Sequence, residues 1–92
     1  MSSMDLEIPH TLGATTARTR IAQVTSSIER DFGAQCRWDT DACLKVTRKG
    51  LQATLLVLED RVKVNLELGL FLRALGPSIR SGIAKRLGEV LT

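Results

Sequence analysis

The chain has 92 residues, of which 43% are hydrophobic and 25% are charged. This length and balance fit one globular domain with a single core and exclude a disordered tail. The net charge of +3 permits attraction to anionic surfaces, but the sequence lacks the dense basic stripe of a dedicated DNA-binding protein.

The first ten residues show no basic segment followed by an apolar stretch. The densest apolar run, residues 68–72, is far shorter than the ~20 residues that a membrane-spanning helix needs. We therefore expect a cytoplasmic protein that is neither secreted nor integral to a membrane.

Residues 1–14 contain Pro9 and Gly13 and show little periodicity, so we expect an extended, flexible lead-in to a single domain formed by residues 15–92. An amphipathic helix then follows to Phe32, with Thr15 or Thr16 as its N-cap and Gly33 as its left-handed end. Its apolar stripe recurs every three or four residues and comprises Ala17, Ile21, Val24, Ile28 and Phe32.

After Gly33 the pattern changes to the alternation of strands. Residues 61–68 alternate strictly, and a two-residue turn at Glu59 and Asp60 would place Val57 opposite Val62. Upstream, a turn at Gly50 and another near residues 40–41 predict two more strands. Their register places Trp38 on the same face as Leu44, in the core.

Cys36 then points inward and Cys43 outward, so the two cannot form a disulfide. Their spacing also fits neither a redox pair nor a zinc site.

A second amphipathic helix is predicted for residues 76–91, with Pro77 in its first turn. The sequence therefore predicts an α+β two-layer sandwich. Its order is helix, four-stranded antiparallel meander, helix, with both helices on one face of the sheet.

The sequence shows no catalytic machinery and no cofactor or metal site. His10 is the only histidine, and we place it in the lead-in, away from any nucleophile. Phosphate-binding glycine motifs are absent, and the carboxylates at residues 39, 41, 59 and 60 suit turns. We expect a protein that is not an enzyme.

Two surfaces are candidates for binding. The apolar segment before the second helix could adhere to a lipid or polymer interface together with nearby arginines, although its large side chains could instead close the core. The candidate contacts are Leu70, Phe71, Leu72, Arg73 and Arg80. The outer sheet face carries Arg37, Lys45 and Lys63 but no aromatic residue on which nucleic-acid bases could stack, so nucleic acid is a disfavoured partner.

The sequence contains a lead-in motif with Pro9, His10, Leu12 and Gly13, followed in order by Ala17-Arg18, Phe32-Gly33, Trp38, Gly50, and Leu68-Gly69 through Phe71-Leu72-Arg73. Over about residues 8–91, these features in this order resemble the small polyhydroxyalkanoic acid system proteins. Cys43 and Gly82 depart from the usual pattern. The resemblance implies a cytoplasmic accessory role in polyhydroxyalkanoate synthesis or storage granules, with the granule surface or granule proteins as partners, and it implies no reaction.

Two alternatives stay open at this point. One is a small carrier that encloses an acyl or hydroxyacyl group between helices and sheet, which a deep apolar pocket would favour. The other is weak nucleic-acid binding by the basic face. A homodimer is also open, because the sheet has free edges and Leu56 and Leu58 face outward.

Overall fold

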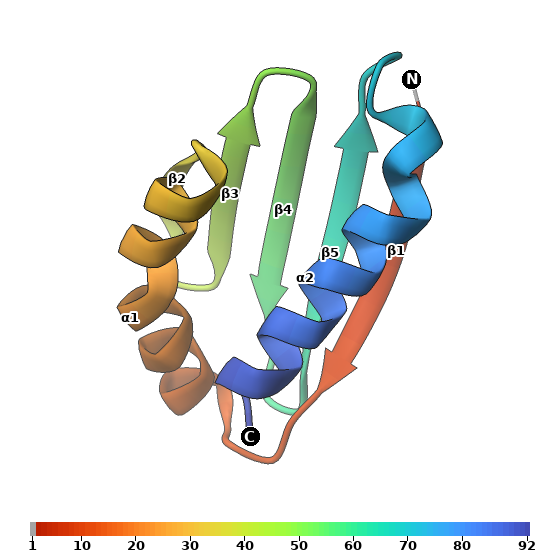
Figure 1. Ribbon diagram of the computed structural model, residues 1–92. Coiled ribbons are helices and arrows are strands. Elements are labelled where there is room, and N and C mark those ends of the chain that lie inside the picture. The colour runs from red at the N-terminus through yellow and green to blue at the C-terminus, as the bar shows by residue number, and fades with distance from the viewer. Residues whose placement is uncertain (1) are drawn as a thin grey trace.

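Five antiparallel strands form one sheet in the order β1-β5-β4-β3-β2. The computed structural model describes residues 2–92. The strands are β1 (Ser2–Pro9), β2 (Gln35–Thr40), β3 (Cys43–Arg48), β4 (Leu51–Val57) and β5 (Arg61–Leu68). The helices are α1 (Ala14–Phe32), the short 3-10 helix η1 (Arg73–Leu75) and α2 (Gly76–Val90). Both long helices cover the same face of the sheet (Figure 1).

The predicted four-stranded meander is wrong by one strand. The N-terminal residues pair with β5 along its whole length, from Ser2 opposite Leu68 to Pro9 opposite Arg61. The side chains of Leu6 and Ile8 are buried on the helix-covered face. Met4, Leu6 and Ile8 alternate with Asp5 and Glu7, a period-two signal that indicates a half-buried strand.

The predicted hairpins are confirmed. Val57 pairs with Val62 across the Glu59–Asp60 turn, and Trp38 pairs with Leu44. The β3–β4 turn is formed by Lys49 and Gly50, and Gly50 has a φ of 82°, which a residue with a side chain rarely adopts.

The core lies between the sheet and the helices. Ile21 of α1 and Leu87 of α2 pack with fully buried residues of the sheet such as Leu44, Val62 and Leu66. Phe32 was predicted in this core and is instead 47% exposed, because the end of α1 lies at the margin of the sheet (Figure 1).

The two ends of α1 differ from each other in how well they were predicted. Gly33 ends the helix in the left-handed conformation, as expected. The start lies at Ala14, so the expected cap at Thr15 or Thr16 is wrong. The carboxylate of Glu59 accepts a hydrogen bond from the Ala14 N–H at 3.3 Å, so the β4–β5 turn provides the acceptor that a capping side chain would supply.

Neither long helix of the described chain has both the length and the apolar character needed to cross a bilayer.

Candidate functional site

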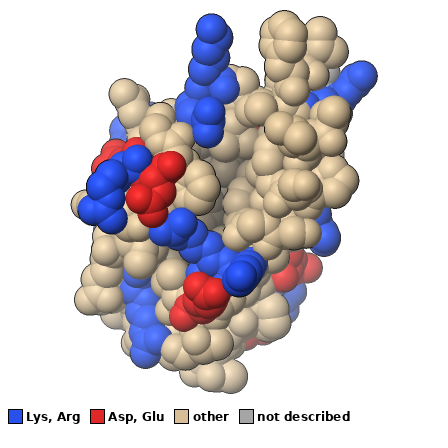
Figure 2. Space-filling model, viewed as in Figure 1, with Lys and Arg blue, Asp and Glu red and all other residues tan. Residues whose placement is uncertain are grey.

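An apolar groove lies between α1 and α2, with the sheet as its floor. Its volume is about 530 Å³, and Figure 2 shows the hollow between the helices. The floor is formed by Val46, Ala53, Leu55 and Val64, and the walls include Ile28 and Phe32 of α1 and Ile79, Gly82 and Ile83 of α2. The groove is therefore lined mainly by aliphatic side chains from all three parts of the fold.

The groove exists because the two helices diverge (Figure 1). At one end they meet, where the Arg20 guanidinium donates a hydrogen bond to the backbone oxygen of Thr92. At the other end α2 begins over β1 and β5, and a Cβ on Gly76 would lie 2.8 Å from the Met4 side chain. The start of α2 thus packs closely at the β1 edge of the sheet, so the groove lies over the middle strands.

Arg86 of α2 links the helices at the groove wall. Its guanidinium donates hydrogen bonds to Asp31 at 2.9 Å and to the Ser27 hydroxyl at 2.8 Å, and it lies 5.1 Å from the centre of the Phe32 ring. The hydrogen bond from Arg86 lowers the pKa of the Asp31 carboxyl, and Ser27 and Arg30 lower it further.

The link between Asp31 and Arg86 predicts a pH dependence. Because the folded-state pKa of Asp31 is lowered, its stabilising contribution is present above the ordinary pKa of aspartate, about 4. That contribution is lost as the pH falls through the lower, folded-state pKa. Asp31→Asn should therefore be less stable than the wild type at pH 7, and the difference should be smaller at pH 2.5. Urea midpoints of both proteins at the two pH values measure this, and a gap that stays constant would contradict it.

The segment between β5 and α2 is exposed. Leu70 is 72% and Phe71 93% exposed, so Phe71 does not close the core. Leu72 is half-buried and lines the groove. Arg73 and Arg80 are exposed. Four of these five candidate contacts therefore face solvent, and one forms part of the groove wall.

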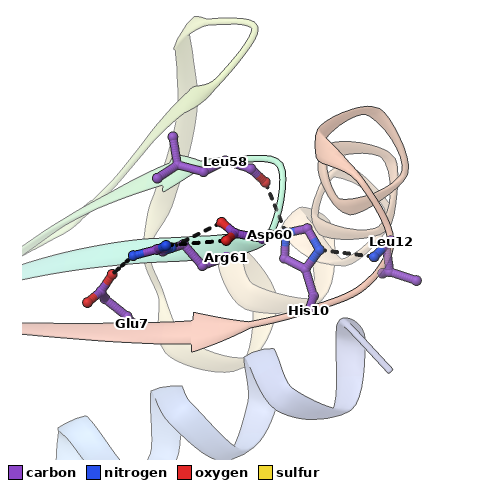
Figure 3. A network of polar contacts seen from close by, with 6 residues as sticks. All are labelled: Glu7, His10, Leu12, Leu58, Asp60 and Arg61. Atoms are coloured by element: carbon purple, nitrogen blue, oxygen red, sulfur yellow. Dashed lines mark hydrogen bonds and ion pairs between the residues drawn. The ribbon is translucent and has the colours of Figure 1, made fainter.

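The lead-in motif anchors the chain to the β4–β5 turn (Figure 3). His10 was expected in a flexible lead-in, but it is only 8% exposed. Its Nδ1 accepts a hydrogen bond from the Leu12 N–H at 3.1 Å, so the ring proton is on Nε2, which donates to the Leu58 carbonyl at 3.0 Å. The His10 backbone N–H also donates to the carbonyl of Asp60 at 2.9 Å.

Other members of the lead-in motif have structural contacts too. Gly13 has a φ of 79°, and a Cβ there would lie 3.3 Å from the Glu59 carboxylate. Arg61, opposite Pro9, donates hydrogen bonds to Asp60 and Glu7 (Figure 3). The hydrogen bond from Arg61 lowers the pKa of Asp60. These contacts hold the β1–α1 connection on the sheet, and none of them faces the groove.

The cysteines and the outer sheet face add little chemistry. Both cysteines are free, and burial raises the pKa of the Cys36 thiol, an effect that Glu29 increases. Among residues 2–92, no three His, Cys, Asp or Glu side chains form a group that could hold a metal ion. The outer face carries acidic residues as well as basic ones, since Asp5 and Glu7 of β1 lie beside Asn65 and Lys63.

The fold and the groove define a small antiparallel α+β domain with a ligand-sized apolar groove. The family model described as "Putative polyhydroxyalkanoic acid system protein" matches residues 4–91, and the chain belongs to this family. No curated protein and no solved structure matches it.

Proposed function

We propose that this protein is a noncatalytic, cytoplasmic accessory protein of the polyhydroxyalkanoate system that binds an acyl or hydroxyacyl chain in the groove between α1 and α2. The groove is the observation that carries the proposal. Its volume of about 530 Å³ lies within the usual range of ligand sites, roughly 300–1,000 Å³. The family supplies the chemical class, because polyhydroxyalkanoic acids are chains of hydroxyacyl units.

The lining supports an apolar chain as the ligand. Ala53 of the floor and Gly82 of the wall lack large side chains, which leaves room between the aliphatic residues around them. An apolar chain placed there would remove aliphatic surface from water on both the protein and the ligand, which is favourable. The guanidinium of Arg86 on the wall already has hydrogen-bond partners within the protein.

Gly82 provides a direct test. A Cβ at Gly82 would meet no atom within 4 Å, so Gly82→Leu can place an isobutyl group at the groove without disturbing the helix. Leucine also favours a helix more than glycine does, by about 0.8 kcal/mol. We expect Gly82→Leu to be at least as stable as the wild type and to bind decanoate and 3-hydroxydecanoate at least tenfold more weakly by calorimetry.

Gly88 is the matched control. It lies on the same helix with equally open space but is not part of the groove lining, so Gly88→Leu should bind like the wild type. Amide chemical shifts in the wild type should change on ligand addition at Ala34, Ala53 and Gly82. Equal binding by Gly82→Leu, or shifts confined to the outer sheet face, would contradict the proposal.

A further inference from the structure

The end of the molecule where the groove opens carries an exposed apolar tip. We use "tip" for the connection 69–75 together with the β3–β4 turn, residues 48–50. Phe71 is 93%, Leu70 72% and Leu75 53% exposed. They are the three most exposed of the large hydrophobic side chains among the described residues. Three such side chains thus lie within six residues, and concentrated exposed apolar surface usually marks a binding surface.

The tip is an ordered structure. The Gly69 N–H donates to the Gly50 carbonyl at 2.8 Å, and the N–H groups of Leu72 and Arg73 donate to the Gly69 carbonyl, each at 3.1 Å. Leu72 packs inward, so that a Cβ on Gly50 would lie 3.4 Å from its Cδ1. The turn that directs Leu72 inward therefore holds Leu70 and Phe71 out in solvent.

The charged side chains within the tip are all positive, namely Arg48, Lys49 and Arg73. Residues 47–51 and 69–80 contain Arg48, Lys49, Arg73 and Arg80 and no aspartate or glutamate. Within residues 2–92, none of these four cations takes part in an ion pair, since the arginines that do are Arg30, Arg37, Arg61 and Arg86. Figure 2 shows basic side chains beside the uncharged surface at the top of the molecule, with the acidic groups lower down.

We propose that the tip docks on a lipid surface that presents anionic head groups, with Leu70 and Phe71 inserted among the acyl chains. Exposed apolar groups with unpaired cations in the same segments complement such a surface in both polarity and charge. A stable protein interface buries roughly 800 Å² per partner, over about 20–30 residues, whereas the tip has only ten residues. An interfacial anchor needs only a few inserted side chains with cations beside them.

The position of the groove adds to this inference. Arg48, Leu72 and Leu75 belong both to the tip and to the groove lining. Docking through the tip would therefore bring the mouth of the groove to the lipid surface. The inference goes beyond the proposed binding of an acyl chain and does not depend on it.

Co-sedimentation with vesicles tests the docking. The full chain should bind vesicles of equal parts phosphatidylglycerol and phosphatidylcholine at least tenfold more strongly than pure phosphatidylcholine vesicles, and 0.5 M NaCl should weaken that binding. Phe71→Asp should lower the partition coefficient on anionic vesicles at least tenfold, and Lys49→Gln about fivefold. The melting temperature of Phe71→Asp should match that of the wild type, since the side chain is exposed.

Two control variants separate this proposal from the others. Leu56 is 38% exposed on the outer sheet face, so Leu56→Asp should leave vesicle binding unchanged. Gly82→Leu should also bind vesicles normally, even though its groove is filled. The docking proposal is overturned by absence of binding to anionic vesicles, by equal binding of Phe71→Asp, or by sedimentation showing that Phe71 instead holds two copies of the chain together.

Discussion

A chain that begins at His10 is expected not to fold under conditions in which the full protein does. Removing residues 1–9 deletes β1 and its pairing with β5, and it removes the buried side chains of Leu6 and Ile8. Burial of each such side chain contributes about 1.5–3 kcal/mol. The free energy of unfolding of a domain of this size is about 5–14 kcal/mol. The loss of these side chains and of the strand pairing should therefore remove most of that stability.

Circular dichroism and thermal melting measure this outcome. The truncated chain should lack a cooperative transition, and Leu6→Ala should lower the free energy of unfolding by about 2–5 kcal/mol. Ser3→Ala, an exposed position on the same strand, should change it by less than about 0.5 kcal/mol. A truncated chain that melts cooperatively within a few degrees of the full protein would show that β1 is dispensable.

His10→Ala should lower the free energy of unfolding by about 2–4 kcal/mol. The substitution leaves the Leu12 N–H and the Leu58 carbonyl without their partner on the imidazole ring. Each unpaired group costs about 1–3 kcal/mol when it is buried, and both groups are only partly buried. The effect would come from the anchoring of the β1–α1 connection and not from chemistry.

His10→Asn is the matched variant for this prediction. An asparagine oxygen can accept a hydrogen bond from the backbone two residues later, so it can keep the Leu12 contact while losing the one to Leu58. We expect about half the loss seen with alanine, measured by urea unfolding, and unchanged ligand binding in the groove. Equal stability of His10→Ala and the wild type would contradict the anchoring role, and loss of ligand binding by a folded His10→Asn would reveal a second role for the residue.

The groove and the tip together suggest how this chain could serve a polymer system. In the two proposals, the groove binds one acyl or hydroxyacyl chain and the tip places the mouth of the groove at a surface. The vesicle experiment and the Gly82→Leu experiment address these two parts separately, because one variant alters only the tip and the other only the groove.

The features that the sequence predicted correctly depend on local patterns. Residues 61–68 alternate, and a two-residue turn before them sets the register of the largely apolar residues 51–57, so that both strands bury a single face. The structure has that register. Gly33, Gly50 and Pro77 mark turns and helix ends through backbone constraints that act at the residue itself. The family was also evident from the sequence, since the model that matches residues 4–91 bears it out.

The candidate site could not be predicted in this way. The sequence raised the possibility of an apolar pocket, but the volume of the groove depends on the angle at which α1 and α2 diverge, and the packing of Gly76 on Met4 contributes to that angle. The exposure of Phe32 follows from the same geometry. For Phe71, an apolar side chain near the end of a strand is compatible with both a core position and a solvent position, and only the turn held by Gly69 and Gly50 decides between them.

The sequence by itself therefore determined a single α+β domain, the three central hairpins with their inward faces, and membership of the polyhydroxyalkanoic acid system family. The tertiary structure decided that the first nine residues complete the sheet, that His10 is an anchor, and that a groove and an apolar tip lie at the same end. The physical reason is the distance along the chain over which each of these signals acts. Alternation and turn residues act over a few neighbours, whereas β1 meets β5 and α2 meets β1 across more than fifty residues of chain, where only the packing of the whole core selects the partner.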